Sequence, residues 1–180
     1  MAVLKQYQIP ATFFVVGEIA KEHPEILRQE VAEGHELANH TYTHIKMLDM
    51  AQAPDQKEML QEISATNDFL ESITGKKIKF FRPPWGKYTP EQQELIQSLG
   101  MEIVLWNICV ENSHATTPEK MADRVIKAAK PNMIILAHDG RLDRSRTVAA
   151  LPLIIESLQN QNYTFVTLTD LYEAENQQAS

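Results

Sequence analysis

The chain has 180 residues, of which 43% are hydrophobic and 23% are charged, a composition typical of one globular domain with a buried core. The formal net charge is −7, which argues against a nucleic-acid partner because no basic stripe is present to neutralise phosphates. No apolar run approaches the roughly 18 residues of a membrane span. The first residues also lack the pattern of a secretory signal, and the single cysteine, Cys109, leaves the redox compartment open.

Strand and helix patterns alternate along the chain. Residues 12–16 form a continuous apolar, β-branched run typical of a strand that is buried on both faces, and Gly17 ends it. Helical spacing or terminal Pro, Thr and Gly residues predict helices over 18–34, 55–73, 90–99, 118–129 and 148–158. Short apolar runs predict strands at 80–81, 103–106, 133–136 and 163–168. This alternation predicts a parallel α/β architecture and favours a barrel.

Three short motifs together outline a hydrolytic metal site. The first contains His40 and His44, which lie one helical turn apart, so both imidazoles could reach one cation if the segment is helical. An H-x-x-x-H pair is a weak signal by itself, because capping and core histidines show the same spacing. The other two motifs are Arg-Pro-Pro-Trp-Gly at 82–86 and Leu-Ala-His-Asp-Gly at 136–140. Their order along the chain strengthens the metal-site hypothesis.

The run Ala-Thr-Phe-Phe-Val-Val-Gly at 11–17, followed by these three motifs in this order, closely resembles the polysaccharide deacetylases of the NodB-homology family, carbohydrate esterase family 4. The resemblance extends over residues 3–171. It implies a single domain over residues 1–180 with an incomplete (β/α) barrel of about seven strands.

The family's first strand ends in a T-F-D-D-G-P type motif, whose two aspartates resemble a general base and a metal ligand. This sequence contains no such motif, and residues 1–10 resemble the helix that follows that strand. We therefore expect an N-terminally truncated domain, with its first strand missing and both aspartates upstream of Met1. Asp49, Asp55 and Asp68 flank or lie on a predicted helix, and we interpret them as surface carboxylates.

The resemblance implies metal-dependent hydrolysis of an acetamide on a sugar. It assigns His40 and His44 as ligands of a divalent metal, most simply zinc, with cobalt or nickel as alternatives. It assigns His138 as the general acid that protonates the departing amine. Arg82 would position the catalytic aspartate through its planar guanidinium, and without that aspartate it needs another anion.

The same resemblance assigns four residues to substrate binding. The backbone N–H of Trp85 resembles the donor to the tetrahedral oxyanion, and its indole offers a face to a sugar ring. Pro84 stiffens the same loop, Leu136 would line the pocket for the acetyl methyl group, and Tyr42 is the fourth candidate.

A fourth motif departs from the family pattern. Where the family often has W-x-V-D-x-x-D-W, this chain has Trp-Asn-Ile-Cys-Val-Glu-Asn-Ser at 106–113. Asn112 stands where an aspartate would orient His138, and Ser113 where a tryptophan would form the pocket wall. Because Asn cannot stabilise an imidazolium, we expect His138 to be a weaker base than usual, with Glu111 as a possible substitute. Three other histidines match no family position. We expect His35 to be structural, and His23 and His114 to lie on the surface.

Three functional hypotheses follow. The first is a metal-dependent deacetylase of N-acetylated amino sugars in peptidoglycan or a chitin-like polymer. The second is a non-catalytic carbohydrate-binding relative or inactive fragment. The third is an O-deacetylase that acts on acetylxylan. The family also implies an extracellular or cell-wall location if an N-terminal segment precedes these residues, and exposed barrel edges predict self-association.

Overall fold

The computed structural model describes residues 1–47, 53–140 and 142–178. Asp49 lies outside the described residues. The chain folds as two compact units. The first unit contains residues 10–105, and the second contains residues 1–9 and 106–180.

The first unit is built on a four-stranded parallel sheet. Its strands are β1 (Thr12–Val15), β2 (Glu36–Asn39), β3 (Phe80–Phe81) and β4 (Glu102–Ile103), and they are hydrogen-bonded in that order. Each connection between consecutive strands contains helix, as parallel pairing requires. These helices are α2 (Gly17–Glu22), α3 (Pro24–Ala32), α4 (Gln56–Thr74) and α5 (Pro90–Ser98), with a short 3₁₀ turn η1 (Pro84–Gly86) after β3.

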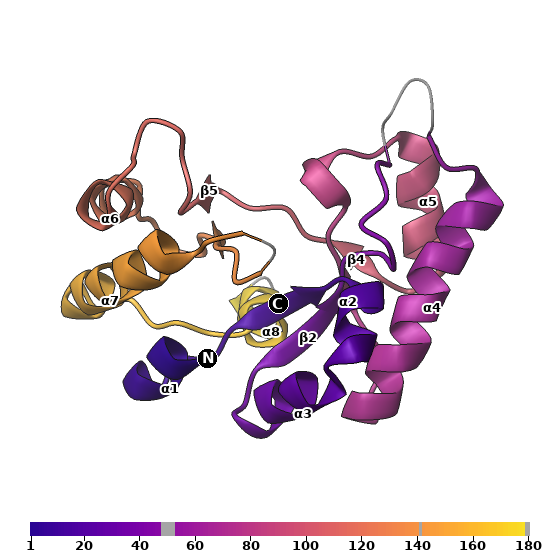
Figure 1. The fold of residues 1–180 in the computed structure, drawn as a ribbon, viewed down its shortest axis with the longest axis horizontal. Coiled ribbons are helices and arrows are strands. Elements are labelled where there is room, and N and C mark those ends of the chain that lie inside the picture. Colours follow the sequence, from indigo (N-terminus) through magenta and orange to yellow (C-terminus); the bar gives the residue numbers. More distant parts are fainter. Residues whose placement is uncertain (48–52, 141, 179–180) are drawn as a thin grey trace. The chain divides into compact units, whose positions relative to one another are not determined.

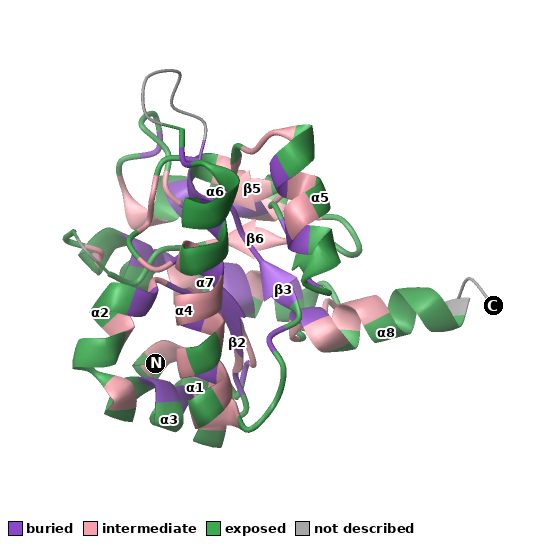
Figure 2. Cartoon of the chain, turned by 90° about the vertical axis from the view of Figure 1, so that its right-hand side faces the viewer, coloured by how far each residue is buried: buried purple, intermediate pink, exposed green. Residues whose placement is uncertain are grey.

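The core of the first unit lies between the sheet and helices α3, α4 and α5. Helix α4 contacts β2, and α4 and α5 run side by side (Figure 1). In Figure 2 β2 and β3 are largely buried, while the outer surfaces of the helices are exposed. The apolar face of α4 includes Met59, Ile63 and Leu70, which are all fully buried.

The second unit contains two short parallel strands and four helices among its described residues. Strands β5 (Ile108–Cys109) and β6 (Ile135–Leu136) pair with Cys109 opposite Leu136. The helices are α1 (Ala2–Tyr7), α6 (Pro118–Lys127), α7 (Ser145–Asn160) and α8 (Leu168–Gln178). Helices α6 and α7 pack against each other (Figure 1). The buried apolar side chains of this unit include Val110, Met121, Val125, Ala150, Ile154 and Leu158.

The local helix signals are confirmed. Asp55 caps α4 by accepting a hydrogen bond from the N–H of Glu58, and Gly75 ends the helix with φ at 66°. Thr89 forms a reciprocal capping box with Gln92 at the start of α5, and Thr117 caps α6 as predicted. Such signals depend on neighbours in the sequence, which explains why they can be recognised from the sequence alone.

Three strand predictions need correction. Three of the four residues of β1 are only half-buried, because β1 lies at the edge of the described sheet rather than inside it. The predicted strand at 103–106 is observed at Glu102–Ile103. Residues 163–167 are not in a strand, and residue 168 begins α8, where the Thr167 hydroxyl accepts a hydrogen bond from the N–H of Asp170. Short segments become strands only where a neighbouring strand supplies partners.

The described strands form two separate parallel sheets and do not close into one ring. The parallel α/β alternation predicted from the sequence is therefore confirmed, and the barrel is incomplete. The edge positions of β1 and β4 in the first sheet are the feature on which the self-association prediction depends. Within residues 1–47, 53–140 and 142–178, none of the helices combines the length and apolar character of a membrane span.

Candidate active site

The two predicted metal-binding histidines lie in a loop, not on a helix. Strand β2 ends at Asn39, and residues 40–46 have no helical assignment. The condition that the segment be helical is therefore wrong. The backbone instead turns through left-handed conformations at Thr41 (φ 66°) and His44 (φ 61°). This turn still brings the imidazole rings of His40 and His44 together, with their centroids 4.9 Å apart.

Two polar side chains hold this histidine loop, which we define as residues 40–44. Asn39 is fully buried, and its amide oxygen accepts the N–H of Thr41 at 2.8 Å. Its Nδ2 donates to the carbonyl of Ile63 at 2.9 Å and thereby ties the loop to α4. Glu62, also on α4, accepts the backbone N–H groups of Tyr42 and Thr43, both at 2.8 Å. The loop conformation is therefore set by long-range contacts to α4.

The hydrogen bonding of His40 suits a metal ligand. Its Nδ1 lies 2.6 Å from the backbone carbonyl oxygen of Arg82, so Nδ1 carries the proton and donates. The lone pair is then on Nε2, which is the arrangement found in histidines that bind metals. Two imidazoles on one tetrahedral zinc, with nitrogens about 2 Å from the ion, have ring centroids roughly 5 Å apart. The spacing of His40 and His44 fits that geometry.

Trp85 lies against the histidine loop and is held in an unusual backbone conformation. It has φ 56° within η1, and 52% of the residue is exposed. Its ring centroid is 4.5 Å from that of His44. Non-glycine residues in left-handed conformations are uncommon and gather at functional sites, where surrounding contacts impose them. Thr41, His44 and Trp85 are three such residues in one small region.

Arg82 is buried beneath this region and is tied to the end of β4. Its Nε donates to the carbonyl of Val104 at 3.0 Å, and an Nη donates to the carbonyl of Leu105 at 3.1 Å. Its guanidinium also stacks 3.8 Å from the centre of the Phe14 ring. The two carbonyl oxygens and the aromatic face stabilise the guanidinium charge.

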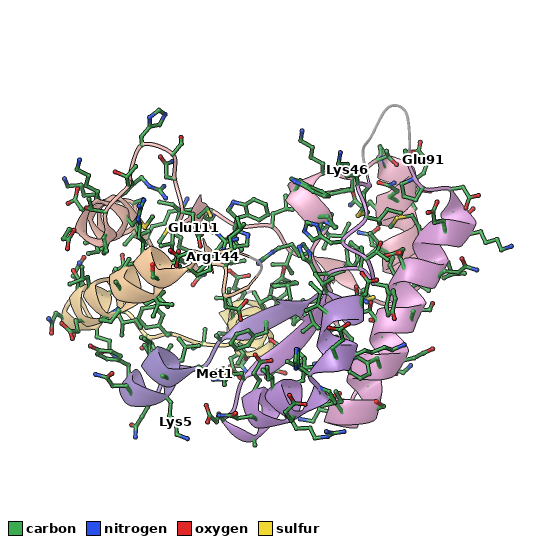
Figure 3. All side chains as sticks on the ribbon, viewed as in Figure 1. Met1, Lys5, Lys46, Glu91, Glu111 and Arg144 are labelled. Carbon is green, nitrogen blue, oxygen red and sulfur yellow. The ribbon has the colours of Figure 1, made fainter. Side chains whose placement is uncertain are left out.

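A second group of polar side chains surrounds Glu111 in the second unit. Glu111 Oε2 lies 3.2 Å from Nδ1 of His138, and Glu111 Oε1 accepts the backbone N–H of His138 at 3.1 Å. The hydroxyl of Thr147, on α7, donates to Oε1 at 2.9 Å. Arg144 approaches the same oxygen to 3.9 Å, and Figure 3 labels both side chains. The carboxylate thus receives polar contacts on both oxygens.

These contacts keep Glu111 ionised. Partial burial by itself would raise the pKa of Glu111, but hydrogen bonds from His138, Cys109, its own backbone and Thr147 together lower that pKa to about 2. An ionised carboxylate at Nδ1 orients the His138 imidazole. His138 itself is half-exposed, with 47% of its side chain accessible. A hydrated imidazole backed by a carboxylate is an arrangement that can donate a proton to a leaving group.

The expectation for Asn112 is corrected by this geometry. Asn112 is exposed, and its side-chain oxygen accepts the N–H of His114 instead of contacting His138. Glu111, not Asn112, is the residue whose side chain contacts His138. Ser113 is exposed.

The remaining predicted substrate-binding residues are placed as follows. Pro84 is buried within η1, and Leu136 is half-buried at the end of β6. The ring of Tyr42 is half-buried, with the ammonium of Lys21 4.9 Å from its centre. Their roles toward a substrate stay predictions. Of the histidines outside the family pattern, His23 and His114 are exposed, and His35 is buried with its Nδ1 accepting the N–H of Ala11.

Several residues of the site were missed by the sequence analysis. Glu62 and Thr147 each lie on a helix and carry no motif, so their roles appear only when the helices are placed against the loops they hold. Asn39 is completely buried, so it supports the histidines and does not cap a surface turn. The C-x-E spacing of Cys109 and Glu111 was a usable signal, because residues two apart on an extended strand share a face.

A family model described as polysaccharide deacetylase matches residues 1–104. A peptidoglycan-N-acetylglucosamine deacetylase of Bacillus cereus is 34% identical over 171 residues, which cover 94% of this chain and 78% of that protein. The chain belongs to the polysaccharide deacetylase family. A chitooligosaccharide deacetylase of Azorhizobium caulinodans is 30% identical and covers 92% of this chain and 83% of its own length.

Solved structures of this family confirm the fold. A family 4 acetyl xylan esterase from Clostridium thermocellum, solved with a cobalt ion, superposes with a TM-score of 0.84 at 32% identity, covering 96% of this chain and 82% of that one. A family 4 pseudoenzyme from Bacillus anthracis superposes with a TM-score of 0.83 at 28% identity, covering 94% of this chain and 58% of that one. The incomplete, distorted barrel predicted from the sequence is therefore the correct fold class.

Proposed function

We propose that this polysaccharide deacetylase removes acetyl groups from N-acetylated amino sugars in peptidoglycan or a chitin-like polymer, with a divalent metal held by His40 and His44. Family membership supports carbohydrate deacetylation in general. The choice of an amide substrate depends on the acid group. An amine leaves poorly unless it is protonated, whereas the alcohol released from an acetyl ester demands less of the acid.

The observation that carries this choice is the contact between Glu111 and His138. The carboxylate lies 3.2 Å from Nδ1, so it holds the ring with Nε2 directed away from the carboxylate. That is the requirement for donating a proton to a departing amine. If the Asn112 amide contacted Nδ1 of His138 in place of the Glu111 carboxylate, the negative charge beside the ring would be lost. An ester substrate would then be favoured.

His40 and His44 would hold the metal, which when bound polarises an acetyl oxygen and lowers the pKa of a coordinated water. His40 is prepared for this role by donating Nδ1–H to the Arg82 carbonyl, which fixes the ring orientation. Trp85, whose ring packs near His44, presents an exposed indole to which a sugar ring can stack. Its backbone N–H is proposed as a donor to the developing oxyanion.

The experiment is to measure acetate release from N-acetylchitooligosaccharides, peptidoglycan and acetylxylan, with the chain loaded with zinc or cobalt and after treatment with a chelator. We expect release from the amide substrates that disappears on chelation and in His44→Ala. Glu111→Gln should reduce release from the amides more than release from acetylxylan, because only the amine leaving group depends strongly on the acid. Activity confined to acetylxylan, insensitive to Glu111→Gln, would contradict the amide assignment.

One observation favours a second candidate, a carbohydrate-binding protein without turnover. Among the described residues, one cluster brings three potential metal ligands of Asp, Glu, His or Cys type close together. That cluster does not include His40 or His44. The family also includes the Bacillus anthracis pseudoenzyme that superposes on this chain. Binding of chitooligosaccharides without acetate release at any metal loading would support this candidate over the enzyme.

A further inference from the structure

We propose that Cys109, Glu111 and His138 form a second site for a zinc-like divalent cation, distinct from the histidine pair and in competition with the acid function of His138. The part about competition rests on the proposed function. The binding site itself does not, because it follows from three side chains of the second unit.

The three side chains already converge on one point. Their potential ligand atoms, Sγ, a carboxylate oxygen and a ring nitrogen, all lie within 4.8 Å of one another. Glu111 Oε2 is the centre of the group, since it lies 3.2 Å from Cys109 Sγ and 3.2 Å from His138 Nδ1. Parallel pairing of β5 with β6 sets Cys109 opposite Leu136, which places His138 just beyond the same strand end. No rearrangement of the backbone is needed to gather these ligands.

The other oxygen of Glu111 is held by groups that would support a bound metal. Oε1 accepts the hydroxyl of Thr147 at 2.9 Å and the backbone N–H of His138 at 3.1 Å. Ligating carboxylates in metal sites are oriented by hydrogen bonds of this kind. The carboxylate is therefore fixed through Oε1 while Oε2 points toward the thiol and the imidazole.

The donor set selects the class of cation. Thiolate, imidazole and carboxylate are the three ligand types of zinc sites, and a site with three protein ligands retains a fourth position for water. Magnesium and calcium prefer oxygen ligands and would not use the sulfur. The partial exposure of His138, 47% of its side chain, gives an ion access from solvent.

The charges and protons balance for one divalent ion. The ion replaces the S–H proton of Cys109, which leaves to solvent, so the thiolate and the Glu111 carboxylate together neutralise the two positive charges. Neutral His138 moves its remaining proton from Nδ1 to Nε2 and binds through Nδ1. Arg144 and Arg124 are the nearby cations that oppose binding. Arg144 lies 3.9 Å from Oε1, and Arg124 is engaged with the backbone carbonyls of Cys109 and Val110.

Occupancy of this site has a chemical consequence. An imidazole bound to a metal through Nδ1 and carrying a proton on Nε2 cannot take up a further proton, so His138 cannot act as an imidazolium acid. Excess metal would then oppose the deacetylation that a metal at His40 and His44 supports. The second unit would thus hold an inhibitory site on the residue that supplies the proton.

Cobalt(II) absorption spectroscopy tests the proposal, because a cobalt-thiolate bond gives an intense charge-transfer band in the near ultraviolet. Cys109 is the only cysteine of the chain, so such a band can arise from no other residue. Cobalt would be titrated under reducing conditions into the wild type, His44→Ala, Cys109→Ser, Glu111→Gln and His138→Ala. Glu173→Gln, an exposed glutamate of α8, is the matched control for Glu111→Gln. Circular dichroism would verify that each variant is folded.

The expected result is a band that saturates at one cobalt per chain, persists in His44→Ala and Glu173→Gln, and disappears in Cys109→Ser. Cobalt affinity at this site should fall about tenfold or more in Glu111→Gln and in His138→Ala, as loss of a metal-supporting group typically produces. No band in the wild type would overturn the proposal. Loss of the band in His44→Ala would also overturn it. The same holds if the cobalt affinity is undiminished in both Glu111→Gln and His138→Ala. The histidine pair contains no thiolate, so its success or failure as a metal site leaves this band unchanged.

Discussion

Glu111→Gln in the metal-free chain should lower the free energy of unfolding near neutral pH, and the loss should disappear in acid. Hydrogen bonds lower the pKa of the folded Glu111 carboxyl from its ordinary 4.5 to about 2. At about 1.4 kcal/mol per pH unit this difference corresponds to about 3 kcal/mol as an upper limit. About a fifth of the side chain is exposed, so solvent screening reduces the figure, and we expect a loss of about 1–3 kcal/mol.

The lowered pKa of Glu111 determines how the stability difference changes with pH. Because the folded pKa is lowered, the stabilisation is fully present above pH 4.5 and is lost as the pH falls toward 2. Urea unfolding of the wild type and Glu111→Gln, measured from pH 7 downward in the presence of a chelator, should give stabilities that converge in acid. Glu173→Gln, which changes an exposed glutamate, should follow the wild type throughout. A difference that stays constant between pH 7 and pH 3 would refute the assignment of Glu111 as the charged partner of His138.

Three further substitutions test the structure around the histidine loop. Asn39→Ala removes a fully buried amide and leaves the N–H of Thr41 without its acceptor, so unfolding in urea should show a loss of about 2–4 kcal/mol, and a loss below 1 kcal/mol would contradict this role. Gly17→Ala places a Cβ 2.6 Å from Oγ1 of Thr66 and should cost about 1–3 kcal/mol, with a smaller cost in a Thr66→Ala background by a double-mutant cycle. Arg82→Lys keeps the charge but loses two directed hydrogen bonds to carbonyls, so thermal unfolding should reveal a loss of about 1–3 kcal/mol; a variant as stable as the wild type would show that these bonds contribute nothing.

The parts of the fold that depend on neighbouring residues could be predicted from the sequence. Thr117 before Pro118 and Gly75 after α4 mark helix ends by local hydrogen bonding and backbone conformation, and the structure confirms both. Strand lengths could not be predicted in the same way. Residues 163–167 have an apolar strand pattern, but the described chain offers no pairing for them. A strand exists only when another segment supplies its hydrogen bonds.

The histidine loop shows why a spacing rule can identify the correct residues for the wrong reason. The four-residue interval suggested a helix, but Asn39 and Glu62 fold the segment into a loop with two left-handed residues. Both contacts join the loop to α4, about 20 residues or more along the chain. The rings of His40 and His44 still meet. What the sequence lacked was any sign of the long-range hydrogen bonds that determine the backbone path.

The sequence pattern pointed to Asn112 as the partner of His138, whereas the structure places Glu111 there, and strand geometry explains the difference. A family pattern assigns roles by position, whereas successive side chains in an extended segment point to opposite faces. Glu111 is two residues beyond Cys109 and shares its face, and the two side chains are in contact. Asn112 turns instead into a bridge with Ala115. A shift of one residue therefore transfers the carboxylate from the expected position to its neighbour without losing the contact with His138.

Both centres depend on residues that touch no substrate. Thr41, His44 and Trp85 adopt backbone conformations that cost of order 1–3 kcal/mol each in isolation, and such conformations persist only when surrounding contacts enforce them. Asn39 and Glu62 provide that enforcement for the histidine loop. Around Glu111 the cost is desolvation of a carboxylate, which Thr147 and the backbone N–H of His138 offset. The geometry of both centres is therefore determined by these supporting hydrogen bonds.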